Sequence, residues 1–404
     1  MSEWKKYKLS EIYTMSSGIS SSKSQAGQGS PFLSFSTVFN NYFIPENLKD
    51  LMLTTKEEQE RFSIIEGDVF LTRTSETLDE LALSSVALNN YPFATFSGFL
   101  KRLRPINKIK VYPKFIAFYL RSSYFRKTII NHTTMTLRAS FNESMFSYLE
   151  VYLPDYDEQV RIGDFLYKLD QKIAINNQIN EELEAMAKTL YDYWFVQFDF
   201  PDENGKPYKS SGGKMVYNEQ LKREIPEGWG VEVISNILDK VPNSNKIVRE
   251  EYLDFGTIPV IDQSREFICG YTEDQNSILT PNDGHIVFGD HTRIVKYINF
   301  EYARGADGTQ IIISKNENVP TVLLYQFISS IDLSNYGYAR HYKFLKEKLI
   351  LVPNINISRK YSENAETIFN RIRQTIFENQ ELTQLRDWLL PMLMNGQVRV
   401  EQGE

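Results

Sequence analysis

Two basic segments each lie directly before a proline that opens a long helical pattern. The first, NHTTMTLRASFN (131–142), is centred on Arg138, and the second, YGYARHYKFLKEK (336–348), combines three tyrosines with a cluster of cations. Guanidinium groups reach phosphates and base edges, and aromatic rings stack on bases, so this composition suits contacts with nucleic acid. A solvated basic loop has the same composition, but its recurrence at two equivalent places favours a binding role. The candidate residues are Arg138, Arg340, His341, Lys343 and Lys346.

A second pair of candidates follows two similar strand patterns, GDVFLTR (67–73) and GHIVFGD (284–290). The loop TRTSET (72–77) leaves the first and GDHTRIVK (289–296) leaves the second. Polar and basic side chains at matching strand ends could add contacts to the same ligand, although an ordinary polar turn explains them equally well. The candidates are Thr72, Arg73, Ser75, His291 and Arg293.

No catalytic signature accompanies these loops. The sequence has no nucleotide-type glycine loop, no Gly-x-Ser-x-Gly elbow, no His-Glu-x-x-His, and no Pro-Pro dipeptide of the amino-methyltransferase kind. His285 and His291, with Asp283 and Asp290 beside them, could conceivably hold a metal, but strand-end histidines more often form structural hydrogen bonds. We therefore expect a binding protein with no metal and no cofactor, rather than an enzyme.

The elements that position these loops come from a duplication. Residues 153–159 (LPDYDEQ) and 352–358 (VPNINIS) are 199 apart, and this offset holds without a gap for nearly forty residues. Trp4 and Trp229 begin a second similarity at an offset of 225. The chain is thus predicted to contain one unit twice, with a regular helix and a more variable domain in each copy.

Each copy carries a long helix, over 155–197 and roughly 358–393, in which apolar or small residues recur at alternating spacings of four and three. That period indicates a coiled-coil seam, and polar residues within it could fix register, although splayed asparagines facing solvent remain the alternative. Pro391 and the pair Asn395–Gly396 are expected to end the second helix. The seam residues are Leu169, Ile173, Asn176, Asn180, Leu183, Leu190, Trp194, Ile368, Ile372, Asn379, Leu382 and Leu389.

The remaining sequence divides into two mixed domains and a connection. Segments 1–153 and 225–353 alternate short β-rich runs with amphipathic helices, expected over 113–130 and 319–331, which is typical of small α+β domains. The linker 201–224 is rich in Pro, Gly, Ser and Lys, a turn-rich or mobile composition. The boundaries are therefore 1–153, helix 154–200, linker 201–224, 225–353, and helix and tail 354–404.

Charge is unevenly distributed along the 404 residues. Taken as an average, the net charge of −7 argues against a polyanionic partner, but residues 101–153 hold 10 basic against 2 acidic side chains. Helix 154–200 holds 4 against 10, and segment 225–353 holds 12 against 17. A single cysteine, Cys269, and the lack of any targeting or membrane segment favour a cytoplasmic protein.

The order of these features resembles the specificity subunit of type I restriction–modification systems. The residues that carry the resemblance are LPDYDEQVRIGDFLYKLDQKIAINNQINEELEAMAKTLYDYWF (153–195), the linker, IPEGWGVEVI (225–234), ARGADGTQII (303–312) and the closing LLPMLMNGQV (389–398). The resemblance covers nearly the whole chain. It departs in the second domain, which is net acidic, and at VPNINIS, which replaces LPDYDEQ at the start of the second helix.

The resemblance implies an α+β protein with two target recognition domains, separated by two long antiparallel coiled-coil helices and related by a pseudo-twofold duplication. Each domain would read one half of a split double-stranded DNA target, without catalysing a reaction. Two methyltransferase subunits would dock on the helices, and restriction or translocase subunits would join them. A coiled-coil adaptor with protein-binding domains is the alternative, and a nuclease or methyltransferase acting alone is a third.

Overall fold

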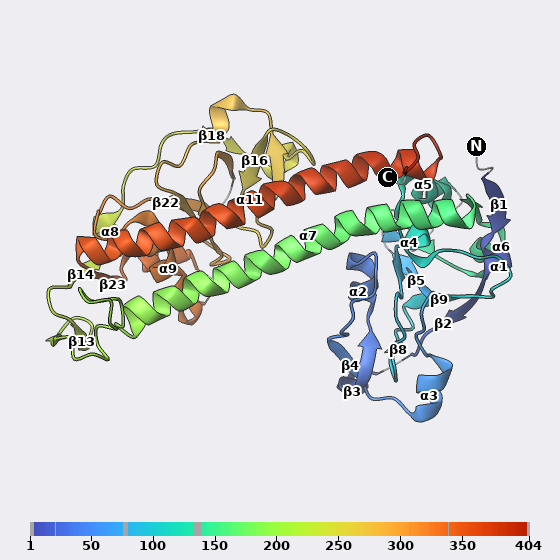
Figure 1. Ribbon diagram of the computed structural model, residues 1–404, viewed down its shortest axis with the longest axis horizontal. Helices are drawn as coiled ribbons and strands as arrows, with labels where there is room; N and C mark the ends of the chain where they lie inside the picture. Colours follow the sequence, from blue (N-terminus) through green and yellow to red (C-terminus); the bar gives the residue numbers. More distant parts are fainter. Residues whose placement is uncertain are drawn as a thin grey trace. The chain divides into compact units, whose positions relative to one another are not determined.

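The chain folds into two compact units that each contain parts of both halves of the sequence. The computed structural model describes residues 4–20, 22–75, 80–131, 139–306, 308–337 and 339–401. Unit 1 comprises Met1–Ala174 and Asn379–Glu404, and unit 2 comprises Ile175–Glu378. The two long helices, α7 (Tyr156–Tyr191) and α11 (Ile355–Met394), therefore each contribute a segment to both units (Figure 1). Within the described residues, no helix has the length and apolar character needed to cross a membrane.

Unit 1 is built on two small sheets. The larger is antiparallel, in the order β2 (Tyr13–Ser17), β9 (Leu100–Pro105), β5 (Val69–Thr72) and β7 (Ser84–Val86). The smaller has the order β4 (Asp50–Met52), β3 (Ala26–Leu33) and β8 (Thr95–Phe96). Two further antiparallel pairs are β1 (Lys5–Lys8) with β11 (Glu150–Leu153), and β6 (Thr74–Ser75) with β10 (Ala139–Ser140). The helices are α1 (Leu9–Ile12), α2 (Phe35–Asn40), α3 (Lys56–Arg61), α4 (Pro113–Arg121), α5 (Ser123–Asn131) and α6 (Glu143–Tyr148).

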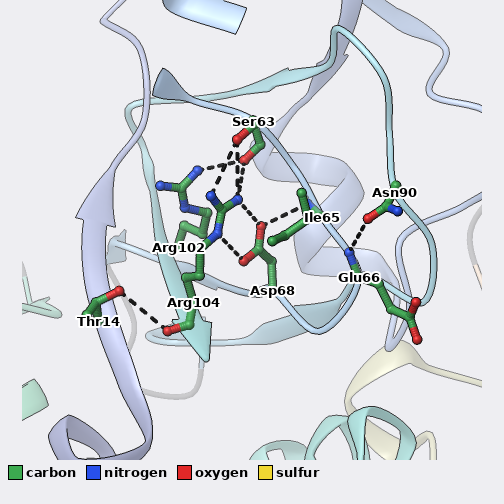
Figure 2. A network of polar contacts seen from close by, with 8 residues as sticks. All are labelled: Thr14, Ser63, Ile65, Glu66, Asp68, Asn90, Arg102 and Arg104. Carbon is green, nitrogen blue, oxygen red and sulfur yellow. Dashed lines mark hydrogen bonds and ion pairs between the residues drawn. The ribbon is translucent and has the colours of Figure 1, made fainter. Parts of the chain in front are cut away.

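A buried ion pair fixes the central strand of unit 1. Asp68, immediately before β5, is fully buried and accepts from Arg104 at 2.8 Å (Nε) and 2.6 Å (Nη2) (Figure 2). The Ile65 amide donates to the same carboxylate at 2.9 Å. Arg102 and Arg104 also donate to the carbonyl oxygen of Ser63, at 2.6 and 2.8 Å. These charge-assisted hydrogen bonds offset the cost of burying the charged groups.

Unit 2 repeats the architecture with more strands. A five-stranded sheet contains β15 (Lys246–Ile247), β21 (Tyr302–Gly305), β16 (Ile258–Ile261) and β17 (Gly270–Thr272), with β18 (Ile278–Leu279) paired to β21. A three-stranded sheet has the order β20 (Val295–Ile298), β19 (His285–Gly289) and β22 (Thr309–Ile312). The antiparallel pairs are β14 (Gly230–Val233) with β23 (Leu349–Val352), and β12 (Met215–Asn218) with β13 (Arg223–Pro226). The helices are α8 (Ile234–Ile237), α9 (Thr321–Ser330) and α10 (His341–Lys346).

The duplication is visible in matching hydrogen bonds at the base of each domain. β1 pairs with β11 in unit 1 as β14 pairs with β23 in unit 2, each leading into a four-residue helix. The amide of Leu9 donates to the Leu149 carbonyl, and that of Ile234 donates to the Lys348 carbonyl, both at 2.9 Å. The same backbone geometry is therefore built from different residues.

Both long helices also begin in the same way. Asp155 accepts from the Glu158 amide at 2.8 Å, and Asn354, 199 residues later, accepts from the Ile357 amide at 3.0 Å. Both are good N-cap residues, so the sequence VPNINIS starts its helix as regularly as LPDYDEQ does.

The long helices run antiparallel within each unit. In unit 2, the buried Asn176 donates to Glu378 at 2.9 Å, and Asn180 accepts from Thr375. In unit 1, Asp170 pairs with Arg386 at 3.2 Å, and Asn379 donates to the Ile173 carbonyl at 3.5 Å. Partner numbers rise on one helix as they fall on the other, which defines the antiparallel direction. Buried among the seam residues are Asn176, Trp194 and Ile372; half-buried are Leu169, Ile173, Asn180, Leu183, Leu190, Ile368, Asn379, Leu382 and Leu389.

One local expectation was wrong, and the structure adds detail to two others. The helix expected over 113–130 breaks at Ser122, whose hydroxyl bonds back to the Tyr119 carbonyl at 2.7 Å, and becomes α4 and α5. α11 ends at Met394, directly before the expected Asn395–Gly396 pair, and it continues past Pro391 because the proline removes only one hydrogen bond near the helix end while Leu390 and Leu393 stay buried in the core of unit 1. The linker is turn-rich, as its composition indicated, and its last residues enter the β12–β13 hairpin; Phe200, directly before the linker, stacks on Trp229 at 5.1 Å.

Candidate nucleic-acid interface

In unit 1, the residues that follow Thr72 at the end of β5 lie beside the segment that precedes α7. β6 pairs with β10, which sets Ser75 opposite Ala139, so the two loops singled out from the sequence lie together. Arg73 sits between them: its carbonyl accepts from the Phe141 amide at 2.8 Å, and its side chain is exposed. Arg138 lies outside the described residues, as does the side chain of Ser75.

Thr72 supports this edge from within. Its side chain is fully buried, and its hydroxyl donates to the Glu80 carbonyl and accepts from the Leu83 amide, both at 2.9 Å. With its hydrogen bonds used internally, the residue holds the turn rather than presenting a surface to a ligand.

Two residues that the sequence reasoning passed over complete this edge. Phe99 projects from the turn between β8 and β9 with 66% of its surface exposed. Lys101 follows it and donates to Ser17 at 2.8 Å; its pKa is lowered by burial and then by the positive charge of Arg73. The signal that could have found them is the Ser-Gly-Phe-Leu-Lys run, a tight turn followed by a cation. We call residues 72–75, 97–101 and 139–141 the first arm.

In unit 2, Asp290 joins the two predicted segments. Its carbonyl accepts from the His341 amide at 2.9 Å and faces His341 Nδ1 at 2.9 Å, and its carboxylate accepts from the Tyr342 amide at 2.9 Å. His341 is buried, with Nε2 facing the Gly337 carbonyl at 3.1 Å. This histidine anchors the segment inside the domain, while its neighbours face outward.

The second basic segment is partly helical, not a loop as its composition suggested. Arg340 forms the N-cap position of α10, with its side chain exposed, and Lys343 is exposed one turn later. Lys346 is half-buried and lies over the Tyr342 ring at 5.1 Å. The helix forms because His341 and Leu345 are buried on one face, which directs the cations to the other.

The remaining candidates occupy the hairpin between β19 and β20. Arg293 is exposed and takes a left-handed conformation (φ 63°), and its amide donates to the Gly289 carbonyl at 2.8 Å. The amide of His291 donates to Gln263 Oε1 at 3.2 Å, and the His291 side chain is exposed. We call residues 289–294, Gly308 and 340–346 the second arm.

The two arms are equivalent by their hydrogen bonds. Arg73 and Asp290 occupy the same place, since each accepts from the segment preceding the long helix, through Phe141 in one unit and His341 in the other. Each also donates across to the neighbouring turn: Arg73 to the Phe99 carbonyl at 2.9 Å, and Asp290 to the Gly308 carbonyl at 2.7 Å. The sequence candidates Arg73, Arg293, Arg340 and Lys343 are thus gathered on two matched, exposed arms.

Not every cation of the basic stretch 101–153 faces outward. Arg121 donates to the carbonyls of Ser84 (2.6 Å) and Val38 (2.7 Å), among others. Arg126 donates to the Leu81 carbonyl at 2.5 Å, and Lys114 pairs with Asp164 at 2.8 Å. With the Arg102 and Arg104 network, these charges stabilise the domain, so the net charge of the stretch overstates what a ligand could meet.

The structure gives no support for metal or thiol chemistry in the described part of the chain. No group of three or more His, Cys, Asp or Glu side chains that could hold a metal ion occurs there. His285 is buried beside the Tyr302 hydroxyl at 3.2 Å, and burial lowers its pKa to about 4. Burial raises the pKa of Cys269 to about 12, which keeps the thiol protonated at neutral pH.

The fold and the two arms define a duplicated α+β protein in which each copy carries a matched exposed surface. Residues 1–185 match the family model of the type I restriction modification DNA specificity domain. Over this part of its length the chain is therefore similar to the specificity subunits of type I restriction–modification systems.

Its relatives span most of its length. It is 24% identical over 340 residues to the MjaIX specificity subunit of Methanocaldococcus jannaschii, covering 78% of this chain and 76% of that one. It is 24% identical to the HindI specificity subunit of Haemophilus influenzae, covering 98% of this chain and all of that one. The fold matches the crystal structure of the type I restriction-modification S subunit from M. genitalium, with a TM-score of 0.59, 14% identity, and coverage of 97% and 96%.

Proposed function

We propose that the chain is the non-catalytic subunit that reads a bipartite double-stranded DNA target, one half-site per arm, for a cytoplasmic type I complex. The observation that carries the proposal is the equivalence of the arms. The same backbone bonds place Arg73 and Lys101 on one arm and Arg340 and Lys343 on the other. Cations on a rigid, repeated frame suit phosphate contacts that set register, with neighbouring side chains left to read bases.

The long helices supply the surface we propose for methyltransferase docking. In unit 1, α11 exposes Trp388 (64%) and Leu385 (41%); in unit 2, α7 exposes Met186 (59%), and the π-helical turn Asp192–Val196 that follows α7 exposes Tyr193 (38%). Met186 and Leu385 are 199 residues apart, so they occupy equivalent positions in the duplicated helices. Exposed apolar residues at equivalent positions suit two copies of one partner. Restriction or translocase subunits would join the complex through those methyltransferases.

The first test is the methylation pattern that the chain directs. We expect host DNA to carry methylated adenines in a split motif, and the motif to disappear when the gene is deleted. The purified chain alone, incubated with DNA, magnesium and S-adenosylmethionine, should show no turnover. Turnover by the chain alone would contradict its assignment as a non-catalytic subunit.

The second test removes two cations from one arm. The double variant Arg340→Ala/Lys343→Ala should weaken DNA binding by the assembled complex while assembly stays intact. Each lost phosphate contact lowers the slope of log K against log salt by about 0.9, so the double change should lower it by about 1.8. Arg359→Ala, at an exposed arginine of α11, is the matched control. Unchanged affinity and slope in the double variant would show that the second arm does not contact DNA.

A further inference from the structure

The turn at the tip of the first arm is fixed by backbone hydrogen bonds and close backbone packing. The Gly98 amide donates to the Ile19 carbonyl at 2.7 Å, and the Leu100 amide donates to the Ser97 carbonyl at 3.0 Å. A Cβ at Gly98 would lie 2.8 Å from the Ile19 carbonyl oxygen, so backbone contact excludes a side chain there. The Phe99 amide is bonded to Ser97 Oγ at 3.2 Å. The turn therefore presents the Phe99 ring from a fixed backbone.

Phe99 is exposed at an edge that also carries the cations Arg73 and Lys101. Phe99 is 66% exposed, although a large apolar side chain gains free energy by burial. The Arg73 guanidinium lies on the Gly98 carbonyl at 3.4 Å, on one side of Phe99 in the sequence, and Lys101 lies on the other. An apolar side chain held at a basic edge suits a ligand that is anionic along its backbone and apolar at selected points.

The second arm has a different arrangement at the same position. There Gly308, with φ +68°, takes the place of Phe99, as the matching bond from Asp290 shows. A Cβ at Gly308 would lie 2.5 Å from Gln263 Nε2 and 2.9 Å from His291 Cδ2, so these two side chains occupy the space above the glycine. One arm thus ends in an aromatic ring, and the other in an amide and an imidazole.

Resting on the proposed function, we propose that Phe99 is a specificity-determining residue that contacts the C5-methyl group of a thymine, whereas the equivalent place in the second arm reads its half-site through the polar pair Gln263 and His291. In the major groove only thymine offers a methyl group, and amide side chains bond to adenine edges. The duplicated frame would then read two different half-sites because the residues at this one position differ in chemistry.

Surface contact fits the ring better than insertion between base pairs. An inserted side chain must partially unstack a base step, which costs a few kcal/mol. About a third of the Phe99 surface is already covered by its own domain, which leaves part of the ring for lateral contact. Insertion is therefore the competing outcome in the test below.

The experiment uses the full chain assembled with its methyltransferase subunits, bound to duplexes that carry its own methylated motif. If an adenine is methylated in each half-site, each half-site contains a thymine opposite it. Replacing thymines one at a time by uracil removes only the methyl group. We expect one replacement, in one half-site, to weaken binding by the parent about fourfold, the effect of one buried methyl group. Phe99→Ala should bind the parental duplex about fourfold more weakly and be indifferent to that replacement.

The controls separate this inference from the function on which it rests. Arg73→Ala should weaken binding but keep the sensitivity to uracil, and Tyr217→Ala, at an aromatic residue 59% exposed on the linker hairpin, should change neither. The proposal would be overturned if the Phe99→Ala complex still responded to uracil. It would also be overturned if Phe99→Ala bound more weakly while the parent was indifferent to every uracil, a result that indicates insertion. Specific binding that does not depend on Phe99 would reject the inference alone, whereas the lack of any motif-specific binding would reject the proposed function.

Discussion

Removing the carboxylate of Asp68 should destabilise unit 1 and disturb the first arm. Asp68 is fully buried, and its carboxylate receives two bonds from Arg104 and one from the Ile65 amide. Asp68→Ala would leave a guanidinium and an amide facing a cavity. Because Asp68 directly precedes β5, which leads to Arg73, lost order here should spread to the residues proposed to meet DNA.

The expected loss of unfolding free energy depends on how well the Arg104 side chain is shielded from water. Breaking a buried ion pair by removing one partner costs about 3–5 kcal/mol. The Arg104 side chain is 27% exposed and keeps its 2.8 Å bond to the Ser63 carbonyl, so water and backbone can compensate in part. We therefore expect Asp68→Ala to lower the free energy of unfolding of unit 1 by about 3 kcal/mol. Asp68→Asn, which keeps one acceptor oxygen and the shape, should lose about 1.5 kcal/mol.

Hydrogen exchange in rising urea, read by mass spectrometry, is the suitable assay because a chain with two units need not unfold in one step. Peptides from β5 and β9 should lose protection at lower urea in Asp68→Ala, while peptides from β19 and β22 serve as the internal reference. Glu150→Gln removes an exposed ion pair with Lys6 and should leave the β5 midpoint unchanged. If Asp68→Ala shifts that midpoint no more than Glu150→Gln does, the buried pair does not stabilise the unit as reasoned.

Three further predictions concern single buried positions. Burial lowers the pKa of His285 to about 4, so on acidification the unfolded chain takes up a proton before the folded chain does. Between pH 7 and 4.5 the parent should therefore lose about 2 kcal/mol more stability than His285→Gln. Urea midpoints at both pH values measure this difference, and equal losses in the two proteins would contradict it. Gly163→Ala should lower the melting temperature although alanine favours helices. The alanine Cβ would lie 2.7 Å from the Phe115 amide nitrogen, which should cost about 1–2 kcal/mol of stability. A higher melting temperature would refute the contact. Asn176→Ala removes a buried bond to Glu378 and should destabilise unit 2 by roughly 2 kcal/mol in exchange protection of α7, with its exposed neighbour Asn177→Ala as the control.

The parts of the fold that depend on local periodicity could be predicted from the sequence. The offset of 199 places Asp155 on Asn354, and both cap a helix; it also places Gln159 on Ser358, and both tie the first helical turn to the loop before α4 or α9. Helix period and caps are set by residues a few positions apart, so they are legible in one sequence. The duplicated α+β architecture with two long helices follows from them.

The sequence indicates which segments form the arms, but not that these segments pair or which of their side chains are exposed. Segments 72–75 and 139–141 pair across more than sixty residues, and no local pattern states that they meet. Nor does the sequence show that the Thr72 and His341 side chains are buried while Arg340 is exposed. That depends on which side of β5 and which face of α10 the core covers. Phe99 was overlooked because an exposed phenylalanine looks, in sequence, like one more core residue.

Net charge was the weakest guide to the site, and the reason is structural. Four of the ten cations in the stretch 101–153 are arginines that bond to carbonyl oxygens inside unit 1: Arg102, Arg104, Arg121 and Arg126. Those charges would be needed whether or not DNA were bound. The acidic balance of segment 225–353 is an equally poor argument against DNA, because the proposed contact needs only the few exposed cations at α10, Arg340 and Lys343. What decides between a reader of DNA and an adaptor is therefore the loss of affinity and salt dependence on removing those two side chains, not the sign of the charge on either domain.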